Sequence, residues 1–330
     1  MIKTVTPIDN TIFVERNFAS NTEVEDALEN SLIARKNWSN TPLVERKNLV
    51  SKFVNSFLSN QEEVIETLCK QIGRPISQCP GEMRGFEERA KFMIDNSDKA
   101  LEDVISKKDN EFDNFIKKEP LGTIFVIAPW NYPFNTSVNS IVPSLLSGNA
   151  VILKHSSQTP LCAEQLFEAA KKANLPKYIF QFLHLDHSTT SKVISDSRIN
   201  HVLFTGSVSG GKEIKKSIGT RFISVGLELG GKDPAYVRSD CNLNHAVENL
   251  VDGSYFNSGQ SCCGIERIYV DKKIYNTFVE KFKDVTEKYV LGNPLEMETN
   301  LGPVVKQAAA NNIRSEVSNA ISQGGKNIID

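Results

Sequence analysis

Two adjacent cysteines, Cys262 and Cys263, follow a Gly-Gln pair in the stretch FNSGQSCCGIERI, at the start of what we expect to be a buried strand. A cysteine acts as a nucleophile once its thiol is deprotonated, and thiols are also among the most frequently buried side chains. Either cysteine could therefore do chemistry or could belong to the core. Because neighbouring side chains in extended backbone point to opposite faces, we expect the two thiols to have different roles.

A carboxylate and an amide could assist such a nucleophile. Glu228 lies within an apolar strand in LELGGKDP. Burial without a nearby partner raises the pKa of a carboxyl group, which suits a general base, although a buried glutamate can also belong to a structural ion pair. Asn131 stands between two prolines in IAPWNYPF, where a fixed turn could aim its amide into a cleft as a hydrogen-bond donor. The alternative is an ordinary turn asparagine.

Two further stretches could bind a ligand. HVLFTGSVSGGKEI places Gly206, Ser207, Gly210 and Gly211 between an expected strand and an expected helix, so that backbone N–H groups and the helix dipole face an anion. The stretch is not the GxGxxG fingerprint, and such a turn can also be only a tight connection. Lys154 ends the expected strand AVILK, at the edge where open α/β sheets bind ligands, and it could also be a solvated lysine.

The elements that must hold these residues follow from hydrophobic periodicity. Apolar positions at helical spacing run from about residue 22 to 104, and Pro42 and Pro80 stand where helices could begin. From Thr123 onward, apolar strands alternate with amphipathic helices, which indicates a mainly parallel sheet with right-handed crossovers. Gly148, just past one of these helices, is expected to take a left-handed backbone.

The sequence therefore predicts an α/β protein with a domain change near Gly230 and Gly231. The first domain spans residues 1–229, and a second β/α region follows at 230–330. Within the first domain we expect three parts: a helical opening at 20–105, a hairpin at about 108–119 and a parallel β/α part at 120–229.

Composition limits the classes of function. The 330 residues are 40% hydrophobic and 24% charged, which is sufficient for a sizeable core and more than one domain. A formal net charge of -2 favours neither nucleic acid nor an anionic membrane as a partner. No apolar run approaches the ~20 residues of a spanning helix, and the start MIKTVTPIDNTIF lacks signal-peptide order, so we expect a cytoplasmic protein. The six cysteines lack disulfide or zinc spacing, so we expect reduced thiols and no metal site.

Taken in order, PWNYPF, LKHSSQTPL, FTGSVSGG, GLELGGKDP and FNSGQSCCGIERI resemble motifs of the aldehyde dehydrogenase superfamily. The resemblance extends from the helical opening to the end of the chain. It implies a Rossmann-type parallel-sheet cofactor domain at 1–229 and a partial α/β catalytic domain at 230–330. In this family the nucleophile is the second residue after the Gly-Gln pair, which is Cys262 here, and Cys263 is then a packing neighbour.

The resemblance also implies a covalent mechanism. The Cys262 thiolate attacks an aldehyde carbonyl, and the Asn131 amide and the Cys262 backbone N–H hold the oxyanion, each donor being worth ~3 kcal/mol of the barrier. The thiohemiacetal passes a hydride to a nicotinamide, and Glu228 activates the water that releases the acid from the thioester. Relatives that transfer the acyl group to coenzyme A usually lack this glutamate, so its presence favours hydrolysis.

The same resemblance assigns a site for NAD or NADP. The assigned residues are Pro129 and Trp130 beside the nicotinamide, Lys154 and Ser157 at the adenine ribose, Gly206, Ser207 and Gly211 at the pyrophosphate, and Leu229. Many NAD-preferring relatives carry a glutamate at the position of Ser157, where the carboxylate repels a 2′-phosphate. Serine removes that repulsion, and Lys154 with a protonated His155 could offer donors to the phosphate, so we expect NADP to be accepted.

The partners implied by the resemblance are a small-molecule aldehyde and further copies of the chain. At full length we expect a homodimer or homotetramer, with the hairpin near Asn110 to Lys118 in the subunit contacts. KHSSQTP and RIYV are similar to segments of branches that include semialdehyde dehydrogenases. These expectations leave the particular aldehyde open.

One departure from the family pattern bears on activity. The family's C-terminal Glu-x-Phe-Gly-Pro motif, whose glutamate holds the nicotinamide ribose, does not occur in the sequence, so we expect the chain to be truncated. Two alternatives therefore stand beside oxidation of an aldehyde to a carboxylic acid. One is a thiol esterase that uses Cys262 and Glu228 without hydride transfer, and the other is a nucleotide-binding remnant without turnover.

Overall fold

The computed structural model describes residues 1–108 and 112–329, which divide into two compact units. The first unit comprises Met1–Ile2, Arg16–Val64 and Gly81–Leu229, and the second comprises Lys3–Glu15, Ile65–Pro80 and the residues from Gly230 onward. One boundary falls between Leu229 and Gly230. The segments 3–15 and 65–80, which the sequence analysis placed in the domain 1–229, pack with the second unit instead.

The first unit is built around a five-stranded sheet with the strand order β7-β6-β5-β8-β9, and every neighbouring pair in it is parallel. The strands are β5 (Thr123–Ile127), β6 (Ala150–Lys154), β7 (Phe180–Phe182), β8 (His201–Gly206) and β9 (Ser224–Leu229). All residues of β5 and β6 are buried, because helices cover both faces of a parallel sheet. The prediction of an α/β fold with a parallel sheet is confirmed.

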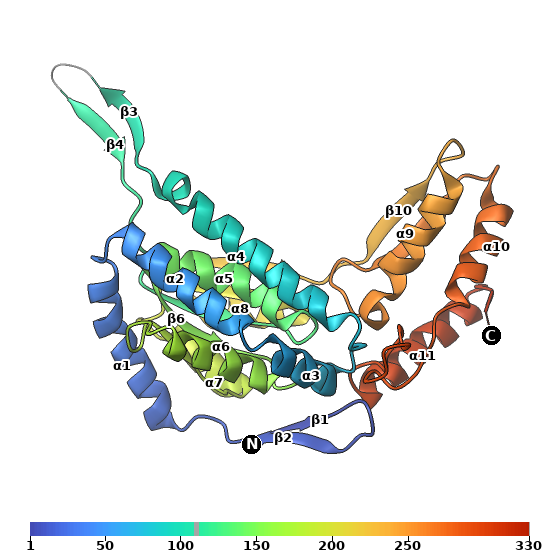
Figure 1. Ribbon diagram of the computed structural model, residues 1–330, viewed down its shortest axis with the longest axis horizontal. Helices are drawn as coiled ribbons and strands as arrows, with labels where there is room; N and C mark the ends of the chain where they lie inside the picture. Colours follow the sequence, from blue (N-terminus) through green and yellow to red (C-terminus); the bar gives the residue numbers. More distant parts are fainter. Residues whose placement is uncertain (109–111, 330) are drawn as a thin grey trace. The chain divides into compact units, whose positions relative to one another are not determined.

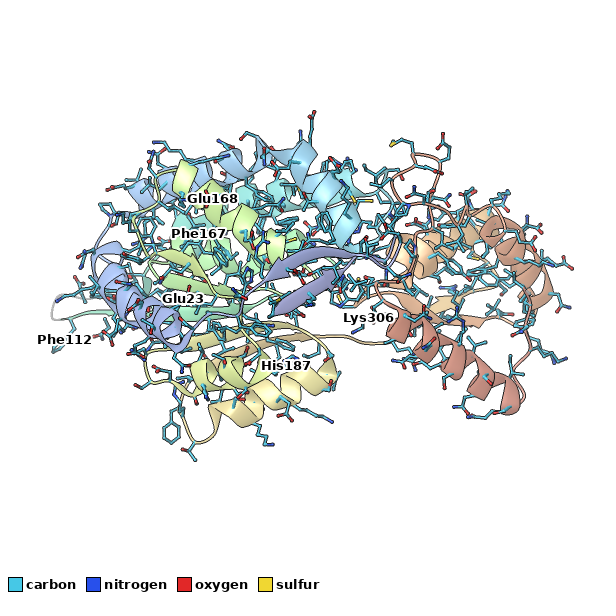
Figure 2. The ribbon with its side chains drawn as sticks, turned by 90° about the horizontal axis from the view of Figure 1, so that it is seen from below. Glu23, Phe112, Phe167, Glu168, His187 and Lys306 are labelled. Carbon is cyan, nitrogen blue, oxygen red and sulfur yellow. The ribbon has the colours of Figure 1, made fainter. Side chains whose placement is uncertain are left out.

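Helices lie on both faces of this sheet. The connecting helices are α5 (Pro133–Leu146), α6 (Pro160–Lys172), α7 (His187–Ser195) and α8 (Val208–Ile218). One face packs against α7, α8 and α1 (Asn21–Trp38) in a core that includes Leu28, Phe125, Ile194 and Ile214. On the other face lie α5 and α6, with α2 (Leu43–Leu58) packed over them (Figure 1). Figure 2 shows Phe167 of α6 and His187 of α7 on opposite sides of the sheet.

Two helices of the helical opening begin where the sequence signals predict. Pro42 immediately precedes α2, and Pro80 is the second residue of α4 (Cys79–Leu101). Proline is tolerated at a helix start because the backbone nitrogens of the first turn have no hydrogen-bond partner within the helix. α1 begins with a capping box in which the Glu23 N–H donates to the Ser20 hydroxyl and the Ser20 N–H donates to the Glu23 carboxylate. Gly148 has a φ of 86°, the left-handed backbone expected past α5. α3 (Gln61–Ile72) completes the helical opening.

Two small two-stranded sheets are separate from the five-stranded sheet. β3 (Val104–Lys108) and β4 (Asp113–Ile116) pair antiparallel, so the hairpin begins inside the predicted helical opening. Figure 1 shows it standing away from the helices of its unit. Asn110, with which the predicted subunit contact begins, lies outside the described residues. β1 (Ile2–Val5) and β2 (Ile12–Arg16) form a second two-stranded sheet, which the sequence analysis did not predict.

The second unit has a smaller two-stranded sheet in which β10 (Asp233–Val237) runs parallel to β11 (Ile265–Val270). Its other elements are α9 (Leu243–Tyr255), the 3-10 helix η1 (Phe256–Gly259), α10 (Tyr275–Thr286) and α11 (Gln307–Ser322). α9 and α10 contribute to a core that includes Val237, Val251 and Phe278. Tyr236 and Tyr269, which are paired across the two strands, are exposed, so β11 is not the buried strand that we predicted.

Over residues 1–108 and 112–329, each helix is either too short or too polar to cross a bilayer.

Candidate active site

The predicted site residues of the first unit lie at one edge of its sheet, where the parallel strands have their carboxyl ends. Ile127 at the end of β5 pairs with Lys154 at the end of β6, and the final pair between β8 and β9 joins Gly206 to Leu229. Motifs that are separate in the sequence are therefore brought to one edge. They contribute Pro129, Trp130, Asn131, Lys154, Ser157, Gly206, Ser207, Gly211, Glu228 and Leu229.

A short turn between β5 and α5 presents Asn131. The Ala128 N–H donates to the Lys154 carbonyl at 3.1 Å, so the chain leaves the sheet only at Pro129. Pro129 is buried, whereas Trp130 and Asn131 are half-buried. The turn therefore leaves part of the Asn131 side chain accessible, and the prolines on either side restrict its backbone.

The start of α5 is capped by a residue from a distant helix. Tyr132 stands at the N-cap position and supplies no side-chain cap. Instead, one carboxylate oxygen of Glu82, from α4, accepts the backbone N–H groups of Phe134 and Asn135, each at 2.9 Å. Glu82 is 1% exposed, so these bonds are shielded from water. Glu82 was not among the predicted site residues, although it holds the start of the helix that begins two residues after Asn131.

Lys154 is the last residue of β6, and Ser157 lies on the loop that follows it. The Lys154 side chain is 9% exposed, and burial lowers the pKa of its amine without an ion pair to offset it among the described residues. A buried amine of this kind gains by donating hydrogen bonds to a ligand that reaches it. Ser157 is exposed on the loop, three residues further along the chain.

His155 is enclosed by its own chain. The Ser156 N–H and the Thr159 hydroxyl approach its Nδ1 at 3.0 and 2.9 Å, and its Nε2 lies 3.4 Å from the Pro133 carbonyl oxygen. Burial lowers the pKa of His155 to about 3, so the ring is neutral at neutral pH. The expectation that a protonated His155 could offer a donor to a 2′-phosphate is therefore wrong, which leaves Lys154 as the cation from this motif.

The turn after β8 brings the start of α8 close to the strand ends. Ser207 is the N-cap of α8, and its hydroxyl oxygen accepts the Gly210 N–H at 3.0 Å. Gly211 is buried, and a Cβ atom there would lie 2.8 Å from the Leu229 side chain. The glycine thus allows α8 to approach β9 closely, and the helix N-terminus lies at the carboxyl edge of the sheet, an arrangement suited to an anion.

Glu228 is exposed, so the prediction that an apolar strand buries this carboxylate is wrong. The reason is the place of its strand: β9 is at the edge of the sheet and has a paired neighbour only in β8. Glu228 pairs with Thr205, one position before the end of both strands. Its suitability as a base therefore depends on its position at the carboxyl edge and not on burial.

Cys262 and Cys263 belong to the second unit and form a turn ahead of β11 instead of extended chain. Both are exposed, so the expected alternation between inward and outward thiols is wrong, as is a packing role for Cys263. Partial burial of the sulfur, and next the adjacent Cys263 thiol, raise the pKa of Cys262. At neutral pH the Cys262 thiol is consequently protonated for most of the time.

Three consecutive left-handed residues precede this turn. Asn257, Ser258 and Gly259 have φ angles of 53°, 58° and 70°. Gln260 closes the loop, because its side-chain amide donates to the Asn257 carbonyl at 3.1 Å while its Oε1 accepts the Val305 N–H at 2.8 Å. The Gly-Gln pair that marks the motif therefore has a structural task, which is to fix the backbone just before Cys262.

The first-unit edge combines groups that fit a dinucleotide. A helix N-terminus and a buried amine suit phosphate and ribose oxygens, and a half-buried tryptophan offers a flat apolar wall. In the part of the chain that the structure describes, no group of three or more His, Cys, Asp or Glu side chains is placed to hold a metal ion.

Comparisons with known proteins identify the family of the chain. The model of the aldehyde dehydrogenase family matches residues 1–330. D-glyceraldehyde dehydrogenase (NADP(+)) of Picrophilus torridus is 30% identical over 309 residues, which are 93% of this chain and 62% of that protein. Succinate semialdehyde dehydrogenase [NAD(P)+] Sad of Escherichia coli is 29% identical over 92% of this chain and 66% of its own length. The chain thus spans about two thirds or less of the length of these relatives.

Solved structures give the same result. Succinic semialdehyde dehydrogenase of Streptococcus pyogenes, in complex with NADP+, has a TM-score of 0.94 and 25% identity over 100% of this chain and 74% of that one. Glyceraldehyde-3-phosphate dehydrogenase GapN of Methanocaldococcus jannaschii, complexed with NADP, has a TM-score of 0.93 and 28% identity over 100% of this chain and 72% of that one. Since the sequence matches along its whole length and the fold agrees, the chain belongs to the aldehyde dehydrogenase family.

Proposed function

We propose that the protein is an NAD(P)-dependent aldehyde dehydrogenase that oxidises an aldehyde to a carboxylic acid through a covalent intermediate on Cys262. One observation carries the proposal: the exposed Cys262 thiol follows a fixed left-handed turn in a chain that matches the family over residues 1–330. An exposed thiol on a rigid backbone can reach a substrate carbonyl while keeping a defined direction of attack.

The chemistry divides among three side chains. The Cys262 sulfur adds to the carbonyl carbon, and the Asn131 amide and the Cys262 backbone N–H donate hydrogen bonds to the oxygen that becomes negative. NAD or NADP, when bound, supplies the acceptor for the hydride that leaves this carbon. Glu228 removes a proton from the water that then attacks the thioester, which releases the acid and returns the thiol.

The cofactor is assigned to the carboxyl edge of the first-unit sheet. Pro129, Trp130 and Leu229 would bound the nicotinamide side, Lys154 and Ser157 the adenine ribose, and Gly206, Ser207 and Gly211 the pyrophosphate. We propose that NADP is accepted as well as NAD. Ser157 carries no charge to repel a 2′-phosphate, Lys154 offers a cation, and relatives such as that of Picrophilus torridus are named for NADP.

For the substrate we propose a short, polar aldehyde. The names of similar proteins support this class, since they specify D-glyceraldehyde, succinate semialdehyde, 3-sulfolactaldehyde and lactaldehyde. Each of these combines an aldehyde with hydroxyl or acidic groups on a short carbon chain. A long alkyl aldehyde serves as the contrasting substrate in the assay.

The hairpin of the first unit supports self-association into a homodimer or homotetramer. Ile105, Phe112, Phe115 and Ile116 are between 56% and 68% exposed, a concentration of apolar side chains that water does not favour. Figure 2 shows Phe112 at the hairpin end of its unit. A second copy of the chain that pairs with this hairpin would cover them, and light scattering after gel filtration measures the resulting mass.

An absorbance assay for reduced nicotinamide tests the proposal. The chain is mixed with NAD or NADP and with the four polar aldehydes or hexanal. We expect a signal with at least one polar aldehyde, lost in Cys262→Ala and kept in Cys263→Ala. Hydrolysis of p-nitrophenyl acetate without any reduced nicotinamide would favour the thiol esterase, and NADP binding by calorimetry without either activity would favour the nucleotide-binding remnant.

A further inference from the structure

A buried arginine contacts the left-handed turn that precedes Cys262. Arg74 is 1% exposed, and its Nε donates to the Oδ1 of Asn257 at 3.0 Å. Asn257 itself is 0% exposed, and its backbone N–H donates to the Oε1 of Gln78 at 3.2 Å. Both partners come from the segment 65–80 of the second unit, far from the turn in the sequence.

The Asn257 side chain is bonded at both ends. Its Oδ1 accepts from Arg74, and its Nδ2 donates to the Gln260 carbonyl at 3.2 Å. The amide therefore cannot rotate without breaking a hydrogen bond that water cannot replace. Ser258 is also held, because its hydroxyl donates to the Gly302 carbonyl at 2.8 Å.

These hydrogen bonds hold the backbone in a conformation that is intrinsically unfavourable. Asn257 and Ser258 have positive φ angles, which are unfavourable for residues with a Cβ atom, more so for serine than for asparagine. Such conformations persist where the surroundings impose them, and they often occur at functional sites. Without the side-chain bonds, the stretch between Phe256 and Gln260 would relax and Cys262 would move with it.

The segment that carries Arg74 is itself anchored in the second unit. Ser77 donates to the Thr299 carbonyl at 3.2 Å, and Gln78 donates to the Asn300 carbonyl at 2.8 Å. The guanidinium is thus attached to a fixed support, so that its position defines the position of the Asn257 amide.

We propose that Arg74 is a positioning residue for the nucleophile: by holding the Asn257 amide it maintains the left-handed turn that sets the direction of the Cys262 thiol. Arg74 acts through Asn257 and the backbone that follows it, so its role is to position the nucleophile and not to take part in the reaction. The inference rests on the proposed role of Cys262, yet one of its tests needs neither an aldehyde nor a cofactor.

Two substitutions separate this role from general stability. Arg74→Lys keeps the charge and most of the stem but has no N–H at the position of Nε. Asn257→Gly removes the bond to Arg74 while glycine adopts the observed φ of 53° without strain. Phe278→Leu is the control, because it loosens a core position of the same unit whose hydrophobic cluster includes no residue of the stretch 256–260.

Kinetics give the first readout. For Arg74→Lys and for Asn257→Gly we expect kcat to fall about ten- to a hundredfold while KM changes less than about threefold, as for a misplaced reacting group. Phe278→Leu should lower the unfolding midpoint and keep kcat within about twofold of the original chain. Circular dichroism establishes that each variant is folded under the assay conditions.

Alkylation of Cys262 by iodoacetamide gives the second readout, measured by mass spectrometry against pH in a Cys263→Ala background, which removes the neighbouring thiol. Partial burial is the first cause that raises the pKa of Cys262. A loosened turn admits water, so in Arg74→Lys and Asn257→Gly the midpoint of the alkylation profile should move to lower pH, and in Phe278→Leu it should stay.

The outcomes distinguish the two proposals. Unchanged kcat and unchanged alkylation profiles in both folded turn variants would overturn the role of Arg74. If the original chain turns over neither aldehyde nor ester but the profiles still move, the proposed function fails while the positioning role stands. If Arg74→Lys does not fold, Asn257→Gly decides the question alone, because it leaves the arginine and its segment in place.

Discussion

Replacing Glu82 with glutamine should destabilise the first unit although the side chain keeps its shape. One Glu82 oxygen accepts the N–H groups of Phe134 and Asn135 at 2.9 Å in a site that is 1% exposed. Hydrogen bonds to a charged acceptor contribute ~1 kcal/mol more than bonds to a neutral one. The attraction between the carboxylate and the helix dipole is largely the same interaction, so it is not added again.

Two such bonds therefore predict a loss of about 2 kcal/mol for Glu82→Gln. In a unit of about 200 residues, this loss corresponds to an unfolding midpoint lower by roughly 4 to 8 °C. Thermal unfolding followed by circular dichroism measures it. Glu87→Gln is the matched control, since Glu87 lies in the same helix but forms an exposed pair with Lys91, and its loss should stay below about 0.5 kcal/mol.

The comparison between the two variants decides whether the reasoning holds. If Glu82→Gln unfolds at the same temperature as Glu87→Gln, the buried carboxylate does not carry the helix cap, and the account of the Asn131 turn is wrong. If the midpoint falls as expected, activity measured well below it shows whether the turn is also displaced. A reduced kcat with unchanged KM would then connect the cap to the proposed oxyanion donor.

Three further outcomes are expected. Glu228→Gln should let the thioester accumulate, visible as an acyl mass on the Cys262 peptide, and normal turnover at neutral pH would contradict the role of Glu228. Ser157→Glu should lower kcat/KM for NADP by about 1 to 3 kcal/mol while NAD is less affected, and equal losses would exclude Ser157 as the selectivity residue. Gly302→Ala would place a Cβ atom 2.0 Å from the Gly73 carbonyl oxygen, so urea unfolding should show a loss of at least about 2 kcal/mol, and an unchanged midpoint would argue against that close contact.

Local signals in the sequence are sufficient to predict much of the first unit. Continuous apolar runs such as AVILK predict strands that are buried on both faces, and prolines mark the starts of α2 and α4. Once the strands are parallel, the residues after them must meet at one edge. This rule places Asn131, Lys154 and Ser207 together without any knowledge of tertiary contacts.

Burial of individual side chains could not be predicted in the same way. An apolar strand pattern indicates burial only where another layer covers the sheet, and Glu228 lies on the edge strand β9. β11 has one neighbouring strand, and its Tyr269 is exposed. The prediction for the two cysteines is wrong for a different reason, because Cys262 and Cys263 form a turn where extended chain was expected.

The residues that support the site could not be predicted because their partners are distant. Glu82 and Phe134 are 52 positions apart, and Arg74 and Asn257 are 183 apart. The sequence does indicate that each site needs a supporting side chain. Tyr132 is not a residue type that caps a helix, and the Asn-Ser-Gly run favours a turn. Which distant side chain supplies the bond depends on the tertiary fold.

The raised pKa of Cys262 bears on how a nucleophile arises from this turn. An ordinary cysteine is only a few per cent thiolate near neutral pH, and partial burial with the adjacent Cys263 thiol leaves Cys262 with less. In the proposed mechanism the turn therefore orients the sulfur but does not favour its ionisation. Deprotonation has to come from a group outside the turn, and Glu228, which belongs to the other unit, is the proposed base. Positioning and activation are thus assigned to different residues, Arg74 through Asn257 for the first and Glu228 for the second.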